Sequence, residues 1–432
     1  MTTPDGTDVL DLVVGALAGG GGCVARAPDG KVVFVRHSLP GERVLARVTA
    51  ATRSYVRADA IEILVPSPDR VDPPCPHAGP GRCGGCDFQH VEIGAQRRLK
   101  AARVEELLHQ IAGVERKIEV EAVDGGRDGL GWRTRVRLAV DRNGGAGFRR
   151  HRTHRVERVR ECPVASTGVA TTGALTASWP GTTELEVITG TTPGEAVVSV
   201  TPRGQGAPRL PGVAAGLVVR GKVRRDPGAV HMDVRGQTYR VSSGVFWQAH
   251  VGAAEALLGA VLECIGDCNG AAVADLYAGA GLFSVALAHA VGPDGSVLAV
   301  ERDRRACADA RHNAAGLPQL SVDEAEVTPE LVATGIGRPS VMVLDPAREG
   351  AGIDVMHALA SHTSALRKLV YVSCDAATFA RDLRVVVDQG WTLSSLRAFD
   401  IFPMTEHVEL VAMLEPSATR SRDVTAGQLG AH

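Results

Sequence analysis

Residues 273–284, VADLYAGAGLFS, constrain the fold of this chain more than any other stretch. An apolar run leads into a Gly-x-Gly turn, and an apolar pattern with helical spacing follows. A buried strand that enters a glycine-rich turn at a helix N-terminus presents backbone N–H groups to a polar ligand. A second apolar run, 297–300, ends in Glu301, whose carboxylate can accept hydrogen bonds from ribose hydroxyls. We therefore expect a parallel α/β sheet that binds a nucleoside-containing cofactor.

A single Gly-x-Gly turn is weak support for this expectation, because ordinary tight turns have the same pattern. Two further apolar runs strengthen it: one precedes Asp345-Pro346 and another precedes Ser373-Cys374-Asp375. The carboxyl ends of parallel strands meet at one edge of an open α/β sheet, and ligands bind there. Four polar clusters at that edge indicate a binding site and not packing alone.

Four segments carry a family resemblance: DLYAGAGLFS, LDPAREG, YVSCDAATFARDL and FPMTEHVELV, in this order and preceded by FWQ. With them the chain resembles the S-adenosylmethionine-dependent RNA uracil-C5 methyltransferases over nearly its whole length. The resemblance implies that residues 241–415 form a Rossmann-like class I methyltransferase domain. It also implies six cofactor-binding residues, which are Gln248 of the aromatic-x-Gln motif, Tyr277, Gly279, Gly281, Glu301 at the ribose, and Asp345 near the methyl donor and the target base.

The chemistry of such enzymes requires a nucleophile, because C5 of uracil does not attack a sulfonium unaided. A thiolate that adds to C6 gives C5 the character of a carbanion, which can take the methyl group. Cys374 is the predicted nucleophile, and we expect its place at a strand end to lower the pKa of the thiol. The resemblance places the base that removes the C5 proton at Glu409, with His407 as the local competitor. The alternative for Cys374 is a buried structural cysteine.

Residues 1–65 combine short β-rich runs with turns at GGGG, PDG and PGE. Regular short strands with such turns predict a small β-barrel. The family counterpart is an OB-like RNA-binding module that is often called TRAM. The alternative is a barrel kept only as a structural cap, since a fold alone does not define a function.

Four cysteines predict a metal or cluster site in the next part of the chain. Cys75, Cys83 and Cys86 follow a C-x7-C-x2-C spacing in a loop rich in proline and glycine, and Cys162 lies far along the chain. Four thiolates suit a tetrahedral zinc ion or an iron–sulfur cluster, and the spacing does not separate the two. The family resemblance favours a 4Fe-4S cluster that joins the two segments; the alternative is a set of reduced free thiols.

Residues 66–240 are expected to form a β-rich central domain that includes these cysteines. Residues 131–160 hold ten arginines against one aspartate and one glutamate, a local charge of +8 in a chain of net charge −2. Arginines alternate with apolar residues on both sides of a glycine turn, so one face of the predicted hairpin is cationic. Such a face can follow an RNA phosphate backbone and should make binding salt-dependent. The alternative is a solvated charged surface.

Length and composition set further limits. The chain has 432 residues, enough for two or three domains. It shows no apolar run long enough to cross a membrane and no signal peptide, so we expect a cytoplasmic protein without a membrane partner, and a monomer. Nine cysteines in that compartment favour metal binding or catalysis over disulfides. Residues 416–432 are polar and patternless, which predicts a disordered tail.

Together these features predict an enzyme that transfers a methyl group from S-adenosylmethionine to C5 of a uridine in RNA. The barrel and the cysteine site favour 23S ribosomal RNA by analogy, with transfer RNA as the alternative substrate. The target should lie in single-stranded or loop RNA, because the base must leave its stack to enter a pocket. Two other hypotheses are a non-catalytic RNA-binding protein of the same fold and a methyltransferase that acts on cytosine.

Overall fold

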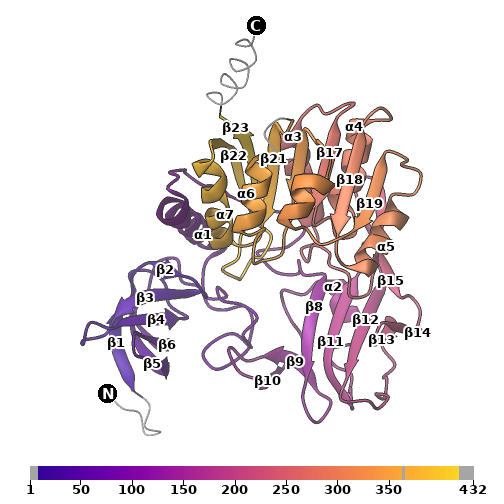
Figure 1. Cartoon of the computed structure of the whole chain (residues 1–432). Coiled ribbons are helices and arrows are strands. Elements are labelled where there is room, and N and C mark those ends of the chain that lie inside the picture. Colours follow the sequence, from indigo (N-terminus) through magenta and orange to yellow (C-terminus); the bar gives the residue numbers. More distant parts are fainter. Residues whose placement is uncertain (1–7, 362–364, 418–432) are drawn as a thin grey trace.

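The computed structural model describes residues 8–361 and 365–417, whose strands form four sheets of six, seven, two and eight strands. Figure 1 shows the N-terminal sheet and the central sheet side by side below the C-terminal α/β domain. The expected multidomain architecture, with an N-terminal β domain and a C-terminal Rossmann-like α/β domain, is confirmed.

The N-terminal sheet has the strand order β1-β5-β6-β4-β3-β2. Its strands are β1 (Val9–Val13), β2 (Leu17–Ala18), β3 (Gly22–Arg26), β4 (Val32–Arg36), β5 (Arg43–Ala51) and β6 (Tyr55–Val65). Alternate residues face a small core, among them Cys23, Val33, Val35 and Val44, none of which is exposed. Three register shifts between the long strands β5 and β6 let them bend around that core.

The cysteine loop leads into a helix that packs on the C-terminal domain. The elements here are α1 (Ile93–Leu107), the short π-helix η1 (Leu108–Ala112) and β7 (Val120–Ala122). Strand β7 pairs in parallel with β22 (Trp391–Asp400) of the C-terminal sheet. Lys100 of α1 is buried and forms an ion pair with Asp400 at 2.5 Å. These elements were expected in the central domain, but long-range pairing places them with the C-terminal sheet.

The central sheet is mixed, with the order β10-β9-β8-β11-β12-β13-β14. Its strands are β8 (Arg135–Val140), β9 (Ala146–Arg149), β10 (Val156–Arg158), β11 (Thr182–Thr189), β12 (Ala196–Pro202), β13 (Gly216–Val219) and β14 (Lys222–Arg225), with α2 (Thr167–Thr171) between β10 and β11. Hairpin β15 (Ala229–Val234) and β16 (Gln237–Ser242) leads to the last domain. Trp179, Leu185 and Val187 lie in the core of the sheet.

The C-terminal sheet has the order β19-β18-β17-β20-β21-β23-β22-β7. Besides β7 and β22 it contains β17 (Ala272–Leu276), β18 (Ser296–Glu301), β19 (Leu320–Glu324), β20 (Val341–Leu344), β21 (Lys368–Ser373) and β23 (Glu409–Pro416). The helices are α3 (Ala253–Ile265), α4 (Leu282–Val291), α5 (Arg304–Asn313), η2 (Leu331–Gly335), α6 (Ile353–Ser361) and α7 (Ala376–Asp388). Strands β17 to β21 are parallel, while β23 is antiparallel to both of its neighbours.

Helices cover both faces of this sheet. Side chains of α3 and α4 share one hydrophobic core with the sheet, and side chains of α1, α6 and α7 share the other. The strand order reverses between β17 and β20, which creates a topological switch point, the place where open α/β sheets bind ligands at the carboxyl ends of their strands. In Figure 1 these ends face the N-terminal and central sheets, so a ligand there would lie between the domains.

Among the described residues, every helix is too short or too polar to cross a bilayer. The predicted disordered tail, 416–432, lies outside the described residues except for its first two positions.

Candidate active site

The glycine turn after β17 has an unusual backbone. Tyr277, Gly279 and Gly281 have φ angles of 66°, 56° and 88°. A positive φ is rare for a tyrosine, and such strain is concentrated at functional sites. A Cβ atom added at Gly279 would meet no heavy atom within 4 Å, so the space in front of the turn is open. The turn therefore offers room and backbone amides to a ligand at the N-terminus of α4.

Glu301 at the end of β18 lies directly beside this turn. Its Oε2 accepts a hydrogen bond from the Gly279 amide at 3.0 Å, and its Oε1 accepts one from the Asp303 amide at 2.7 Å. The structure thus brings together two of the residues that the resemblance assigned to the cofactor. Each carboxylate oxygen can accept further hydrogen bonds, as two ribose hydroxyls require.

Asp275 on β17 is a candidate that sequence reasoning missed. Its side chain is fully buried, Oδ2 accepts a hydrogen bond from Ser284, and Oδ1 has no partner in the described structure. Burial raises the pKa of Asp275 to about 7. An unpartnered carboxylate oxygen behind the turn is a ready acceptor for a ligand. An acidic residue inside the apolar run was the only sequence signal for it.

Asp345, which follows β20, and Glu409, the first residue of β23, form a pair of carboxyl groups. Glu409 is 2% exposed. Burial, followed by repulsion from Asp345, raises the pKa of Glu409 well above its usual range. Burial and the nearby Asp275 raise the pKa of Asp345 to about 7. Two carboxyl groups with raised pKa values can hold or accept a proton near neutral pH.

Cys374 follows β21 and lies close enough to Asp345 and Glu409 for both carboxyl groups to affect the pKa of its thiol. Burial, followed by repulsion from Glu409 and Asp345, raises the pKa of its thiol to about 12 against the opposing effect of Arg348. The expectation that the strand end lowers this pKa is wrong, because burial and neighbouring carboxylates outweigh the start of α7. Cys374, Asp345 and Glu409 nevertheless lie at one site, although they belong to the ends of three separate strands.

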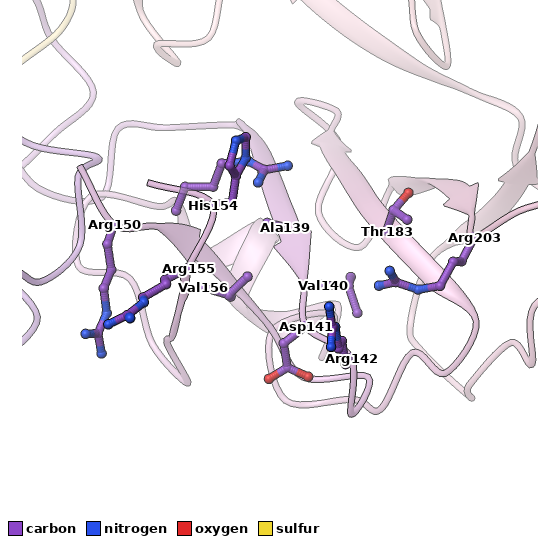
Figure 2. A pocket seen from close by; sticks show the side chains of 11 residues that line it. Ala139, Val140, Asp141, Arg142, Arg150, His154, Arg155, Val156, Thr183 and Arg203 are labelled. Carbon is purple, nitrogen blue, oxygen red and sulfur yellow. The ribbon is translucent and has the colours of Figure 1, made fainter. Parts of the chain in front are cut away.

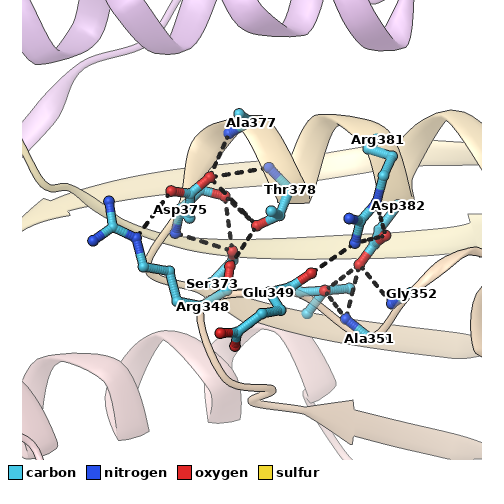
Figure 3. A network of polar contacts seen from close by, with 11 residues as sticks. Arg348, Glu349, Ala351, Gly352, Ser373, Asp375, Ala377, Thr378, Arg381 and Asp382 are labelled. Atoms are coloured by element: carbon cyan, nitrogen blue, oxygen red, sulfur yellow. Dashed lines mark hydrogen bonds and ion pairs between the residues drawn. The ribbon is translucent and has the colours of Figure 1, made fainter. Parts of the chain in front are cut away.

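The loop that follows Asp345 is held by α7 (Figure 3). Arg348 Nε pairs with Asp375 at 3.3 Å, and the Thr378 hydroxyl donates to the Arg348 carbonyl at 3.0 Å. Asp375 also caps α7 by accepting hydrogen bonds from the amides of Ala377 and Thr378. Arg348 is therefore held beside Cys374 and is the nearby cation that lowers the pKa of its thiol.

Asp382 is a second residue that the sequence did not reveal. It is fully buried and accepts hydrogen bonds from the Tyr371 hydroxyl at 2.7 Å and from the Ala351 amide at 2.9 Å. Arg381 pairs with its other oxygen at 2.7 Å (Figure 3). These contacts fasten the far end of the Asp345 loop to α7.

Residues 401–408, which we term the base loop, lead directly into Glu409. The amides of Asp87 and Phe88 donate to the carbonyl of Met404, each at 2.9 Å. Oε2 of Glu406 accepts hydrogen bonds from the amides of Gly20 and Gly21 at 2.6 and 2.7 Å. The base loop therefore contacts both the turn between β2 and β3 of the N-terminal sheet and the residues that follow Cys86.

His407 lies in the base loop next to the predicted base. Burial, together with the nearby Arg348, lowers the pKa of His407 to about 4, so the ring is neutral at pH 7. Its ring packs edge-on against Phe402 with centroids 6.0 Å apart.

Gln248 lies apart from the other predicted cofactor residues. It lines a pocket of about 500 Å³ together with Thr134, Thr189 and His250, and none of the residues of the glycine turn line that pocket. Phe246 of the same motif is 63% exposed. The assignment of Gln248 to the cofactor therefore stays a prediction.

The four predicted cysteine ligands line one cavity of about 20 Å³. Burial raises the pKa of Cys83 to about 11 and that of Cys86 to about 12, and in each case the thiol of Cys162 contributes to the rise. Among the described residues, no three His, Cys, Asp or Glu side chains are arranged to hold a single metal ion. Cys86 and Cys162 also pack against a small hydrophobic cluster of Trp132, Val164 and Met404, the last of which belongs to the base loop.

Comparison with known proteins identifies the family of the chain. Residues 8–61 match the TRAM domain family. The chain is 45% identical to an uncharacterised RNA methyltransferase of Streptomyces coelicolor over 94% of this chain and 93% of the relative. It is 30% identical to the 23S rRNA (uracil(1939)-C(5))-methyltransferase RlmD of Shewanella sp. MR-7, over 90% of this chain and 91% of the relative.

Among solved structures, the fold matches a tRNA (uracil-54, C5)-methyltransferase of Pyrococcus abyssi in complex with S-adenosyl-L-homocysteine. The TM-score is 0.71 at 22% identity, and the match covers 93% of this chain and 99% of the other.

A parallel sheet that binds at its switch point, with a carboxylate beside a strained glycine turn, defines the C-terminal half as a class I methyltransferase domain. The TRAM match at residues 8–61 and the relatives that match nearly the whole chain narrow this class to the RNA methyltransferases. The chain belongs to the S-adenosylmethionine-dependent RNA uracil-C5 methyltransferase family.

Proposed function

We propose that this protein methylates C5 of a uridine in 23S ribosomal RNA through a covalent adduct between Cys374 and C6 of the base. The observation that carries the proposal is the convergence of one thiol and two carboxyl groups, Cys374, Asp345 and Glu409, at the carboxyl-end edge of the sheet. A thiol and a buried carboxyl group with a raised pKa are the two groups that this reaction requires.

In the first step the sulfur of Cys374 forms a bond to C6 of uracil. The electrons of the C5–C6 double bond move toward O4, which gives an enolate with carbanion character at C5. S-adenosylmethionine, bound at the glycine turn, supplies a methyl group to C5 and leaves as S-adenosylhomocysteine. Glu409 then removes the C5 proton, the C5–C6 double bond forms again, and the bond from C6 to the sulfur of Cys374 breaks.

The raised pKa of Cys374 determines how the first step of the reaction begins. At neutral pH the resting residue is a thiol, so its proton must leave as the sulfur adds. An ionised Asp345 is the group at hand to accept it, because Asp345 acts on this thiol and Glu409 must stay ionised to remove the C5 proton. Asp345 returns the proton to the sulfur when the bond to C6 breaks. The thiol is therefore activated by proton transfer within the site and not by a standing thiolate.

The residues around the glycine turn fit S-adenosylmethionine. Open space at Gly279, the carboxylate of Glu301 and the unpartnered oxygen of Asp275 offer room and acceptors for its ribose and its cationic groups.

We also propose that Cys75, Cys83, Cys86 and Cys162 would hold a 4Fe-4S cluster. Four partly buried thiols around one cavity fit either a zinc ion or such a cluster, and the family resemblance favours the cluster. When bound, the cluster would neutralise thiolates and tie the loop at 75–86 to residue 162.

The choice of 23S rRNA rests on the Shewanella relative, which is named for that substrate. Transfer RNA is the second candidate, because the Pyrococcus structure with the same fold is named for a tRNA substrate.

The decisive experiment incubates the purified protein with methyl-labelled S-adenosylmethionine and separate pools of unmodified ribosomal RNA and tRNA, followed by nucleoside mass spectrometry. Label in 5-methyluridine from ribosomal RNA is expected. Label in tRNA would retain the chemistry and change the substrate. Cofactor binding without 5-methyluridine in either pool would contradict the proposal.

A further inference from the structure

A wide hollow on the central sheet lies outside the catalytic site. It has a volume of about 680 Å³ and crosses strands from β8 to β12. The residues that line it include five arginines and one aspartate: Arg142, Arg149, Arg150, Arg155, Arg203 and Asp141. In Figure 2 these arginines extend along the hollow from Arg150 and Arg155 at one end to Arg203 at the other. We term this hollow the arginine trench.

Most of the positive charge in the trench is unpaired. The nearby carboxylates are already engaged, since Asp141 pairs with Arg158 at 2.5 Å and Glu157 pairs with Arg150 at 2.8 Å. In the described structure Arg142, Arg149 and Arg155 have no carboxylate partner, and all three are exposed. A group of uncompensated guanidinium ions at close range repels itself and attracts an anion.

The trench continues toward the N-terminal sheet. The Gly84 amide donates to the Arg149 carbonyl at 3.1 Å. This bond joins the hairpin of β9 and β10 to the loop at residues 75–86 that holds three of the cysteines. Burial, followed by the nearby Arg36, Arg152 and Arg57, lowers the pKa of His151 at the tip of the hairpin to about 4. Arg36 and Arg57 belong to the N-terminal sheet, so the hairpin tip lies near cations of that sheet.

The lining chemistry defines the ligand. The lining contains five arginines and one histidine but no Phe, Tyr or Trp, so cationic groups outnumber aromatic rings there. Arginines match phosphate groups, which they can bind through two parallel hydrogen bonds. Such contacts position a nucleic acid without reading its sequence.

We infer that the arginine trench binds backbone phosphates of an RNA segment that lies outside the catalytic pocket, so that the substrate is held at two separate places. This inference rests on the proposed function only in taking the anion to be the substrate RNA. In Figure 1 the carboxyl ends of β17 and β18 face the central sheet, which carries the arginine trench, so we take one RNA molecule to reach both places.

The test compares two double variants of the full chain. Arg142→Gln/Arg155→Gln removes two trench cations. Lys222→Gln/Arg224→Gln removes two exposed cations from β14, at the opposite edge of the same sheet, and serves as the matched control. Binding is measured by fluorescence anisotropy with a labelled, unmodified 23S rRNA transcript in a series of salt concentrations. Equal thermal unfolding midpoints exclude misfolding.

The trench variant should bind about tenfold more weakly near 0.1 M salt, and its log–log salt slope should be shallower by about 1.4 to 1.8. Its methylation rate at saturating RNA should match wild type while its KM rises. A trench variant with the affinity and slope of the control would overturn the inference. Wild-type protein that binds the transcript but forms no 5-methyluridine would contradict the proposed function and leave this test valid.

Discussion

Cys374, Asp345 and Glu409 illustrate how single residues acquire their chemical properties from their surroundings. Each follows or begins a different strand, yet both carboxyl groups raise the pKa of the Cys374 thiol, and Asp345 also raises the pKa of Glu409. In the proposed mechanism, the raised pKa of the thiol requires that its proton move to a group within the site. Predictions at the residue scale therefore concern the movement of single protons.

Replacing Cys374 with alanine should abolish formation of 5-methyluridine, because no other group in the site can add to C6. RNA affinity should stay within a few-fold of wild type. Nucleoside mass spectrometry and anisotropy measure the two effects, and Cys268→Ala, a buried cysteine beyond the end of α3, is the control. Retained turnover would remove Cys374 as the nucleophile.

Glu409→Gln should trap a covalent complex of protein and methylated RNA, because the C5 proton can no longer be removed and the thiol cannot leave. The complex should appear as a slow band on a denaturing gel and as a mass increase of the protein. Glu415→Gln on the same strand should form no such complex. An active Glu409→Gln enzyme would place the base elsewhere.

Asp275 should make the folded protein less stable as pH rises. Its pKa is about 7 in the folded state against 3.8 for an ordinary aspartate, so between these values the folded state binds a proton that the unfolded state has lost. Stability should therefore fall from about pH 4 to about pH 7, by at most roughly 4 kcal/mol for this group.

The variant Asp275→Asn should lose much less stability over that pH range. Urea unfolding at several pH values measures the effect, and Asp294→Asn, an exposed aspartate, should behave as wild type. An unchanged pH profile for Asp275→Asn would show that Asp275 ionises normally.

At the scale of elements, the base loop depends on parts of the chain far from it in sequence. Glu406 binds two amides of the turn between β2 and β3, and the Gln96 side chain of α1 accepts a hydrogen bond from the Met404 amide at 2.8 Å. The N-terminal sheet thus contributes to the position of Glu409, in addition to any contact that it makes with RNA.

Glu406→Ala should lower kcat by about tenfold, because the loop that positions the general base loses two charge-assisted hydrogen bonds. Binding of S-adenosylmethionine should be unchanged. Single-turnover methylation and calorimetry separate the two effects. Glu62→Gln, an exposed carboxylate on β6, is the control. Equal rates for both variants would show that the hydrogen bonds from Gly20 and Gly21 to Glu406 do not position the predicted base.

At the scale of the whole molecule, contacts between remote segments hold the domains together. Lys100 and Asp400 form a buried ion pair across 300 positions of sequence, and Cys162 lies with three cysteines of the 75–86 loop. A cluster at those cysteines would tie the cysteine segment to the start of the central sheet.

Protein purified without oxygen should be brown, and Cys162→Ser should lose the colour and unfold at a lower temperature. Visible absorbance, iron analysis and calorimetry test this. Cys264→Ser, in a buried helix, should keep both iron and colour. Colourless wild-type protein with one equivalent of zinc would rule out the iron–sulfur cluster.

Much of the fold and part of the site follow from local sequence pattern. Apolar runs that end in polar residues predicted β17, β18, β20 and β21, because the periodicity of burial is a property of neighbouring residues. The same pattern placed Glu301 beside the glycine turn, and the structure joins Glu301 to Gly279 by a hydrogen bond. The family motifs added the roles of Cys374 and Glu409, which stay predictions.

Only the tertiary structure decided the electrostatics and the long-range contacts. The pKa of Cys374 depends on burial and on carboxylates from other strands, and these distances are not encoded in the residues next to it. The same reason explains why Asp275, Asp382 and Glu406 were missed and why β7 was assigned to the central domain. Strand patterns are local in the chain, whereas desolvation and charge interactions depend on every segment that folding brings close.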